Sequence, residues 1–240
     1  MTDQEMDKYL NKTTLLNFDN KVIQELIDGR KWKDFAEKER ILYIYNFVRD
    51  EIRFGYNRKD ALPASEILKD GYGQCNTKGI LFMALLRAAE IPCRLHGFTI
   101  HKELQKGVIS GIWYRLAPEE IVHSWVEVYY SKKWLNIEGF ILDLPYLKKL
   151  QQKFEDRSGF FCGYGVCTKA FKKPDIYWNE NDTYIQKEGI KQDFGLFDDP
   201  DSFYRSHTQE LNFMKKFLYQ NLTRHLMNSN VNNIRSSTIN

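Results

Sequence analysis

The sequence predicts an α+β fold. Residues 75–89 are apolar on most sides, as expected for a helix buried at the centre of a domain, and Pro92 ends that helix. Three later segments are rich in Val, Ile, Tyr and Trp, which is typical of strands: residues 93–100, 123–130 and 134–142. A central helix followed by several strands is therefore the predicted core.

The other predicted elements are helical or irregular. Apolar residues at spacings of three and four predict an amphipathic helix over residues 37–52. Further helices are predicted from Leu62 to just before Gly71, over residues 143–154 and over residues 209–227. We expect the polar tail from Asn228 to fray. Residues 103–120 are predicted to form a loop-like insertion, and residues 159–195 an aromatic, irregular segment.

Length and composition predict one domain with a C-terminal extension. The 240 residues can bury a full core. We expect a core with N-terminal helices over residues 1–157, and an aromatic segment and C-terminal helix that pack on it over residues 158–240. Hydrophobic residues make up 42% and charged residues 28%, which is ordinary for a globular protein. The net charge of +3 is spread along the chain, so we expect no nucleic-acid partner.

The N-terminal sequence and the short apolar runs predict a cytoplasmic protein. Residues 1–20 lack the apolar run of a secretory signal, and every apolar run is interrupted well before the roughly 20 residues that a bilayer requires. We therefore expect no membrane partner, and we expect the four cysteines, at 75, 93, 162 and 167, to be reduced. Cys162 and Cys167 have no second Cys or His pair near them in the sequence, so we expect no metal and no cofactor.

Cys75 is the candidate nucleophile. A thiol attacks as the thiolate, and the free N–H groups and dipole of a helix N-terminus favour that anion. Cys75 begins the predicted buried helix, after the turn Gly71-Tyr72-Gly73, which leaves room for a substrate carbonyl. The backbone N–H of Cys75 can help hold the oxyanion of a tetrahedral intermediate. Cys167 follows a similar Gly-Tyr-Gly run, but the residues after it, up to Pro174, cannot continue as a buried helix.

His123 and Glu138 are the candidate base and orienting acid. A histidine can take and return a proton near neutrality, since its reference pKa is about 6.5. If the turn near Ser131-Lys132 has an even number of residues, the two side chains share one face of the sheet, directly opposite or one diagonal apart. A carboxylate there would fix the imidazole tautomer and stabilise the imidazolium. The other histidines, at 96, 101, 207 and 225, are predicted to be structural.

Four runs of residues together resemble the bacterial transglutaminase-like family. They are Gly71-Tyr72-Gly73-Gln74-Cys75, then Leu85-Leu86-Arg87-Ala88-Ala89-Glu90-Ile91-Pro92-Cys93-Arg94, then His123-Ser124-Trp125-Val126-Glu127-Val128, and then Trp134-Leu135-Asn136-Ile137-Glu138. The resemblance covers roughly residues 38–143. It implies a papain-like fold in which the helix that bears the cysteine packs on an antiparallel sheet that bears the histidine and the acid. It also implies an enzyme that transfers acyl groups through a thiol.

The resemblance leaves parts of the site open. The family usually has Asp where this chain has Glu138, so nearby Asp143 is an alternative acid. Gln74 and Trp125 are possible oxyanion or substrate contacts, although a solvent-facing Gln and a packed Trp are equally good or better readings. The resemblance implies that the substrate is a peptide, a protein or a small amide.

The reaction is open as well. Hydrolysis and transamidation fit equally, and an amide synthase that acts on a carrier-bound acyl group is an alternative. An inactive binding module is another alternative, for which Glu138 is the one hint. The sequence does not indicate an oligomeric state.

Overall fold

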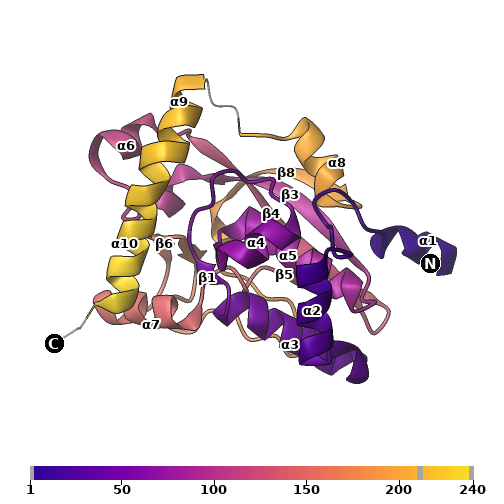
Figure 1. Ribbon diagram of the computed structural model, residues 1–240. Coiled ribbons are helices and arrows are strands. Elements are labelled where there is room, and N and C mark those ends of the chain that lie inside the picture. Colours follow the sequence, from indigo (N-terminus) through magenta and orange to yellow (C-terminus); the bar gives the residue numbers. More distant parts are fainter. Residues whose placement is uncertain (1–2, 210–212, 238–240) are drawn as a thin grey trace.

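The computed structural model describes residues 3–209 and 213–237, and it has the α+β architecture that the sequence predicts (Figure 1). A four-stranded antiparallel sheet lies at its centre, in the order β5-β4-β3-β8. Its strands are β3 (Cys93–His101), β4 (Glu120–Tyr130), β5 (Lys133–Ile137) and β8 (Ile190–Phe197). Two short pairs lie outside this sheet: β1 (Arg53–Phe54) with β2 (Tyr72–Gly73), and β6 (Phe161–Gly163) with β7 (Val166–Thr168).

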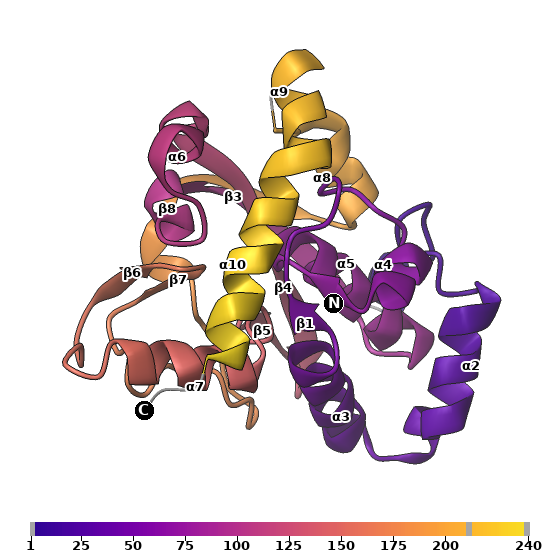
Figure 2. The ribbon, with the colours of Figure 1, turned by 60° about the vertical axis from the view of Figure 1, so that its left-hand side comes forward.

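Helices lie around the sheet. Figure 1 shows four of them together: α2 (Lys21–Arg30), α3 (Glu37–Asp50), α4 (Ala64–Asp70) and the central helix α5 (Cys75–Ala88). The remaining helices are α1 (Asp3–Met6), α6 (Gly111–Leu116), α7 (Leu144–Lys153), α8 (Pro200–Ser206), α9 (Phe213–Leu218) and α10 (Arg224–Ser236). A π-helical turn, Tyr219–Thr223, joins α9 to α10 in one long rod, and both views show the end of that rod beside α7 (Figures 1 and 2).

The predicted central helix is confirmed as α5. Every residue from Cys75 to Ala88 is buried, which matches a sequence that is apolar on most sides. The side chain of Asn76 ties the start of α5 to β4, because Nδ2 donates to the carbonyl of Val122 at 2.9 Å and Oδ1 accepts from Ser124 Oγ at 3.1 Å. These two partners are the neighbours of His123 in the strand, so Asn76 fixes the start of the helix beside that histidine.

The sheet departs from the prediction at two points. The segment 134–142 was predicted to be one strand, but β5 ends at Ile137 and the chain then leaves the sheet, where the N–H of Glu138 donates to Thr183. The segment 159–195 was predicted to be irregular, but β8 begins inside it and pairs with β3. The strand β8 could not be predicted from its sequence. Most of its residues are half-buried or exposed, and buried and exposed positions do not alternate regularly along it.

The C-terminal prediction was partly wrong. A helix was predicted over 209–227; residues 210–212 lie outside the described residues, and helix is present from Phe213 onward. The tail from Asn228 does not fray, since α10 continues to Ser236. Asn228 binds both backbone groups of Tyr56, at 2.7 and 3.0 Å, and apolar side chains of α10 such as Val231 are buried. The insertion at 103–120 likewise contains a 3-10 turn and α6.

One pair of cysteines contradicts the prediction that all four are reduced. Cys162 and Cys167 form a disulfide, because the β6–β7 hairpin places them directly opposite each other, with their Cα atoms 4.2 Å apart. Cys75 and Cys93 are free and buried. Within the described residues, no helix is long and apolar enough to cross a bilayer.

Lys78 is fully buried in α5 and makes the stability of the protein depend on pH. Its Nζ donates to the carbonyl oxygens of Arg49 and Ile141, at 3.1 and 2.9 Å. Burial lowers the pKa of Lys78 to about 7. Between about pH 7 and the ordinary lysine value of 10.5, the unfolded chain therefore binds a proton at Lys78 that the folded protein lacks. Burial of this lysine thus costs most at low pH, and the cost disappears as the pH rises through that range.

Lys78→Met is expected to raise the free energy of unfolding relative to the wild type at pH 6, and this gain is expected to shrink steadily toward pH 10. Urea unfolding of both proteins across that range measures the difference. Taking the difference removes the contributions of the groups that do not interact with Lys78. The control is Lys148→Met, at an exposed position of α7, whose difference from the wild type should stay near zero at every pH. A gain for Lys78→Met that does not change with pH would contradict the prediction.

Candidate active site

Cys75 is the first residue of α5 and lies where the backbone N–H groups of the helix are free. Gly71 precedes it in the left-handed conformation, with φ of +67°, which glycine adopts readily. A Cβ at Gly73 would lie 2.6 Å from Thr77 Oγ1, so only glycine fits this close turn. The N-terminus of α5 favours a thiolate at Cys75 through its N–H groups and dipole.

The β4–β5 hairpin brings His123 and Glu138 together. Tyr130 pairs with Lys133, so the turn has two residues, and both of them, Ser131 and Lys132, have positive φ as in the tightest hairpins. In this register, residue 138 lies one diagonal from residue 123 on the same face. His123 Nε2 and Glu138 Oε1 are 2.8 Å apart, and both side chains are fully buried. This is the geometry that an even-numbered turn predicts.

Three backbone N–H groups hold the other oxygen of Glu138. Oε2 accepts from Ile185, Gln186 and Lys187 at 2.8, 2.9 and 3.1 Å. These bonds fix the orientation of the buried carboxyl group toward His123. The segment 185–187 had no recognisable role in the sequence, because backbone N–H groups leave no signal in residue types.

The second ring nitrogen of His123, Nδ1, is buried without a hydrogen-bond partner among the described residues, and Cys75 is its polar neighbour. Burial by itself would lower the pKa of His123. Electrostatic interactions with Cys75 and Glu138 outweigh burial and raise that pKa to about 10. The histidine is therefore held as an imidazolium beside Cys75 and Glu138.

The structure gives Gln74 and Asp143 other partners. Gln74 Nε2 donates to Asp60 Oδ1 at 3.0 Å, and its Oε1 accepts from the N–H of Asn57, also at 3.0 Å. Asp143 caps α7 by accepting from the N–H of Tyr146 at 2.9 Å, and it pairs with Arg235 at 2.7 Å. Glu138, and not Asp143, is therefore the carboxylate that binds His123.

Trp125 lies on the same strand face as His123 but does not line the cavity beside Cys75. Its ring packs against Phe98, His96 and Tyr184, with ring centroids 4.2, 5.3 and 5.6 Å away. The structure thus places Trp125 in an aromatic cluster of the sheet.

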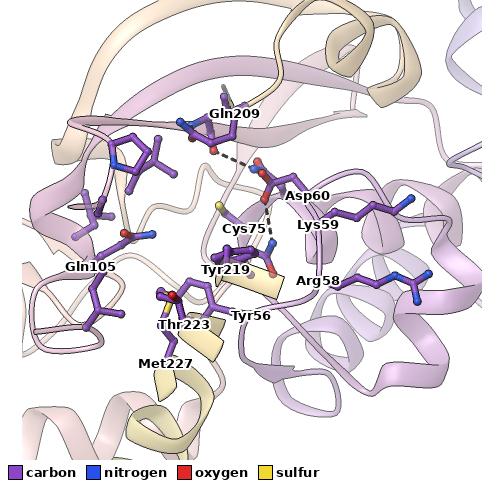
Figure 3. A pocket seen from close by; sticks show the side chains of 18 of the residues that line it. Tyr56, Arg58, Lys59, Asp60, Cys75, Gln105, Gln209, Tyr219, Thr223 and Met227 are labelled. Atoms are coloured by element: carbon purple, nitrogen blue, oxygen red, sulfur yellow. Dashed lines mark hydrogen bonds between the residues drawn. The ribbon is translucent and has the colours of Figure 1, made fainter. Parts of the chain in front are cut away.

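A cavity of about 570 Å³ lies in front of Cys75. Figure 3 shows the Cys75 sulfur facing into it, with Gln105 on one side and Asp60 on the other. The insertion between β3 and β4 and the rod of α9 and α10 supply much of the wall, for example through Trp113 and Tyr219. No role of the insertion could be read from its residues, and the structure makes it part of this cavity.

Sequence reasoning missed three polar residues of the cavity wall. Asp60 is held by Gln74, and burial raises the pKa of its carboxyl group. The Oε1 of Gln186 is buried with no hydrogen-bond partner among the described residues, and Tyr204 is buried as well. None of the three residues belongs to one of the sequence motifs, so no sequence signal pointed to them. Within residues 3–209 and 213–237, no group of three His, Cys, Asp or Glu side chains could hold a metal ion.

Comparison with known proteins gives a family match and distant structural matches. Residues 24–139 match the model of the transglutaminase-like superfamily. A candidate cysteine protease from Cytophaga hutchinsonii is 13% identical, with a TM-score of 0.46 over 83% of this chain and 49% of that one. Red sea bream transglutaminase is 16% identical, with a TM-score of 0.29 over 55% of this chain and 25% of that one. This chain thus spans half or less of the length of either protein, and no curated protein sequence matches it.

The matched region contains the buried helix, the β4–β5 hairpin and the three residues that these elements bring together. Cys75, His123 and Glu138 all fall between residues 24 and 139. The segment 185–187 that holds Glu138, and the rod that walls the cavity, lie beyond the match. Through residues 24–139, the chain is similar to the transglutaminase-like superfamily.

Proposed function

We propose that this protein is a cysteine-dependent acyl-transfer enzyme, with Cys75 as the nucleophile, His123 as the general base and acid, and Glu138 as the orienting acid. The observation that supports it best is the buried pair of His123 Nε2 and Glu138 Oε1 at 2.8 Å, which leaves Nδ1 unpaired on the side of Cys75. A histidine used only for packing would not need a buried carboxylate held by three N–H groups.

The proposed reaction proceeds through an acyl-enzyme. The Cys75 thiolate attacks the carbonyl carbon of an amide or thioester, a C–S bond forms, and the carbonyl π electrons move to oxygen. As the intermediate collapses, the bond to the leaving group breaks and His123 gives its proton to the departing amine or thiol. Water or an amine then attacks the acyl-enzyme and gives its proton to His123, and Cys75 leaves as the thiolate. Glu138 stabilises the imidazolium throughout.

The size of the cavity bears on the substrate. A volume of about 570 Å³ lies within the range of pockets that bind small ligands, roughly 300–1,000 Å³. A small amide, or one side chain or chain end of a peptide or protein, is therefore the substrate class that we propose. Glu in place of Asp at position 138 was the one hint of an inactive binding module. It no longer favours that alternative, because the longer Glu138 side chain still reaches His123.

Labelling with iodoacetamide tests the proposal. Cys75 is expected to react at least about tenfold faster than Cys93 at pH 7, because Cys75 is activated as a thiolate and burial raises the pKa of the Cys93 thiol. Mass spectrometry of partly labelled protein measures both rates. Cys93 is a matched internal control, since it is the other free, buried cysteine of the chain.

The variant His123→Ala is expected to remove the preference for Cys75, and His225→Ala, at an exposed position of α10, is expected to retain it. Equal labelling of both free cysteines in the wild type would refute the proposed activation. So would a His123→Ala variant that labels at the wild-type rate.

A further inference from the structure

The two sides of the cavity in front of Cys75 differ in polarity. Residues 58–60, which are Arg, Lys and Asp, line one side, and Figure 3 shows Asp60 there, with Gln105 of the insertion on the other side. Gln105 is the one polar residue among the described residues with which the insertion lines the cavity. The insertion and the start of β4 also supply an apolar wall of half-buried or exposed side chains: Trp113, Leu116, Ala117, Pro118 and Ile121.

The apolar wall is preformed, because hydrogen bonds fix the insertion that carries most of it. The carbonyl oxygens of Leu104 and Lys106 accept from two N–H groups in the turn between β6 and β7, at 2.7 and 2.8 Å. The carbonyl oxygen of Val108 accepts from Asn230 of α10 at 2.8 Å. The wall therefore keeps apolar surface in contact with the cavity, and an apolar group that covers this surface removes it from water.

The chemistry at Cys75 decides which part of a substrate can use this wall. After the leaving group departs, the acyl group stays bound to the Cys75 sulfur until water or an amine attacks it. The leaving amine and the attacking molecule are polar and must exchange with solvent in the meantime. Arg58 and Lys59 are exposed, and Figure 3 shows both side chains directed away from Cys75. The polar side therefore suits this exchange, and the apolar wall suits the acyl group.

We propose that the acyl group transferred by Cys75 carries an apolar arm of several carbons, which lies against the apolar wall. The inference rests on the proposed acyl transfer and narrows its substrate class to apolar acyl donors. A cavity of about 570 Å³ has room for such an arm beside the reacting carbonyl. Each methylene that the wall covers is expected to raise the rate of acylation about twofold to fourfold.

Two isomeric thioesters test on which side of the carbonyl the apolar arm belongs. S-Ethyl thiohexanoate has its long chain on the acyl side, and S-hexyl thioacetate has it on the leaving group. With either of them, the Cys75 sulfur bonds to the carbonyl carbon, the C–S bond to the alkanethiolate breaks, and this thiolate takes a proton from His123. The wild type is expected to react at least about tenfold faster with S-ethyl thiohexanoate. Rapid quench and mass spectrometry measure the acylated protein and the released thiol.

Leu116→Gln and Ile112→Gln are a matched pair of variants. Both residues lie in α6 and are 46% and 54% exposed, so neither change removes a buried side chain. Leu116 lines the cavity, whereas Ile112 is not among the described residues that do. Leu116→Gln is expected to lower the preference for S-ethyl thiohexanoate about threefold to tenfold, and Ile112→Gln is expected to retain it. S-Ethyl thioacetate, which has no long arm, should acylate both variants at the wild-type rate.

The outcomes separate the inference from the function on which it rests. If iodoacetamide does not prefer Cys75 and no thioester acylates it, the proposed function and the inference are both overturned. If iodoacetamide prefers Cys75, but S-ethyl thiohexanoate reacts no faster than its isomer, only the apolar arm is overturned. A preference that Leu116→Gln and Ile112→Gln retain equally would overturn the assignment of the arm to the apolar wall.

Discussion

Glu138→Gln is expected to slow the acylation of Cys75 by about 10²–10⁴-fold. The glutamine oxygen can still accept from the three N–H groups of residues 185–187, so its NH₂ group must face His123. His123 Nε2 then has to accept a hydrogen bond, and the ring proton moves to Nδ1, on the side of Cys75. A neutral imidazole with its proton there cannot take one from the thiol.

The pH dependence of acylation gives this prediction a second readout. Glu138 helps to raise the pKa of His123 to about 10, so the wild-type imidazolium persists to about that pH. Without the carboxylate, the pKa of His123 falls, and the alkaline limb of the rate profile should move to lower pH. Rates measured from pH 5 to 11 test this shift. A Glu138→Gln profile that matches the wild type in both height and position would rule out the assigned role.

Asp143→Ala is expected to lower the free energy of unfolding by about 3–5 kcal/mol. The Asp143 side chain is buried and joins three segments of the chain. It accepts from the N–H of Phe54 at 2.8 Å, caps α7 through Tyr146 and pairs with Arg235 of α10. Removing it leaves the largely buried guanidinium of Arg235 without its carboxylate and α7 without its cap.

Urea unfolding at pH 7 measures this loss, and Asp156→Ala, at an exposed position just after α7, is the control that should change little. Although burial opposes it, Arg235 lowers the pKa of Asp143 below the ordinary 3.8. The stabilisation by Asp143 is thus complete above that pH and is lost as the pH falls through the lower folded-state value. A loss under 1 kcal/mol for Asp143→Ala would contradict the prediction. The two acids that the sequence left open should separate in this way, one affecting rate and the other stability.

The parts of the fold that the sequence predicted are those with a local signal. The apolar sequence of α5 shows its burial directly, and Gly73 before Cys75 marks a turn that only glycine can make. The diagonal pairing of His123 with Glu138 followed from strand periodicity and one assumption about turn length, which the two-residue hairpin satisfies. Helix, strand and hairpin rules were enough here, because each of them depends on neighbours in the sequence.

The parts that were wrong or unpredicted depend on distant partners. The polar run from Asn228 stays helical because Asn228 binds Tyr56 and Arg235 binds Asp143, and neither partner is visible in the run itself. The disulfide of Cys162 and Cys167 depends on the hairpin register of β6 and β7. The place of the insertion in the cavity wall is defined only by what surrounds it in space.

The N–H groups that bind Glu138 belong to residues 185–187, which are synthesised after it. Cys75, His123 and Glu138 leave the ribosome well before these residues do. Until then, the Glu138 carboxylate lacks all three N–H groups that hold its Oε2. Under the proposed function, Cys75 is therefore expected to become fully reactive only after residues 185–187 have been synthesised.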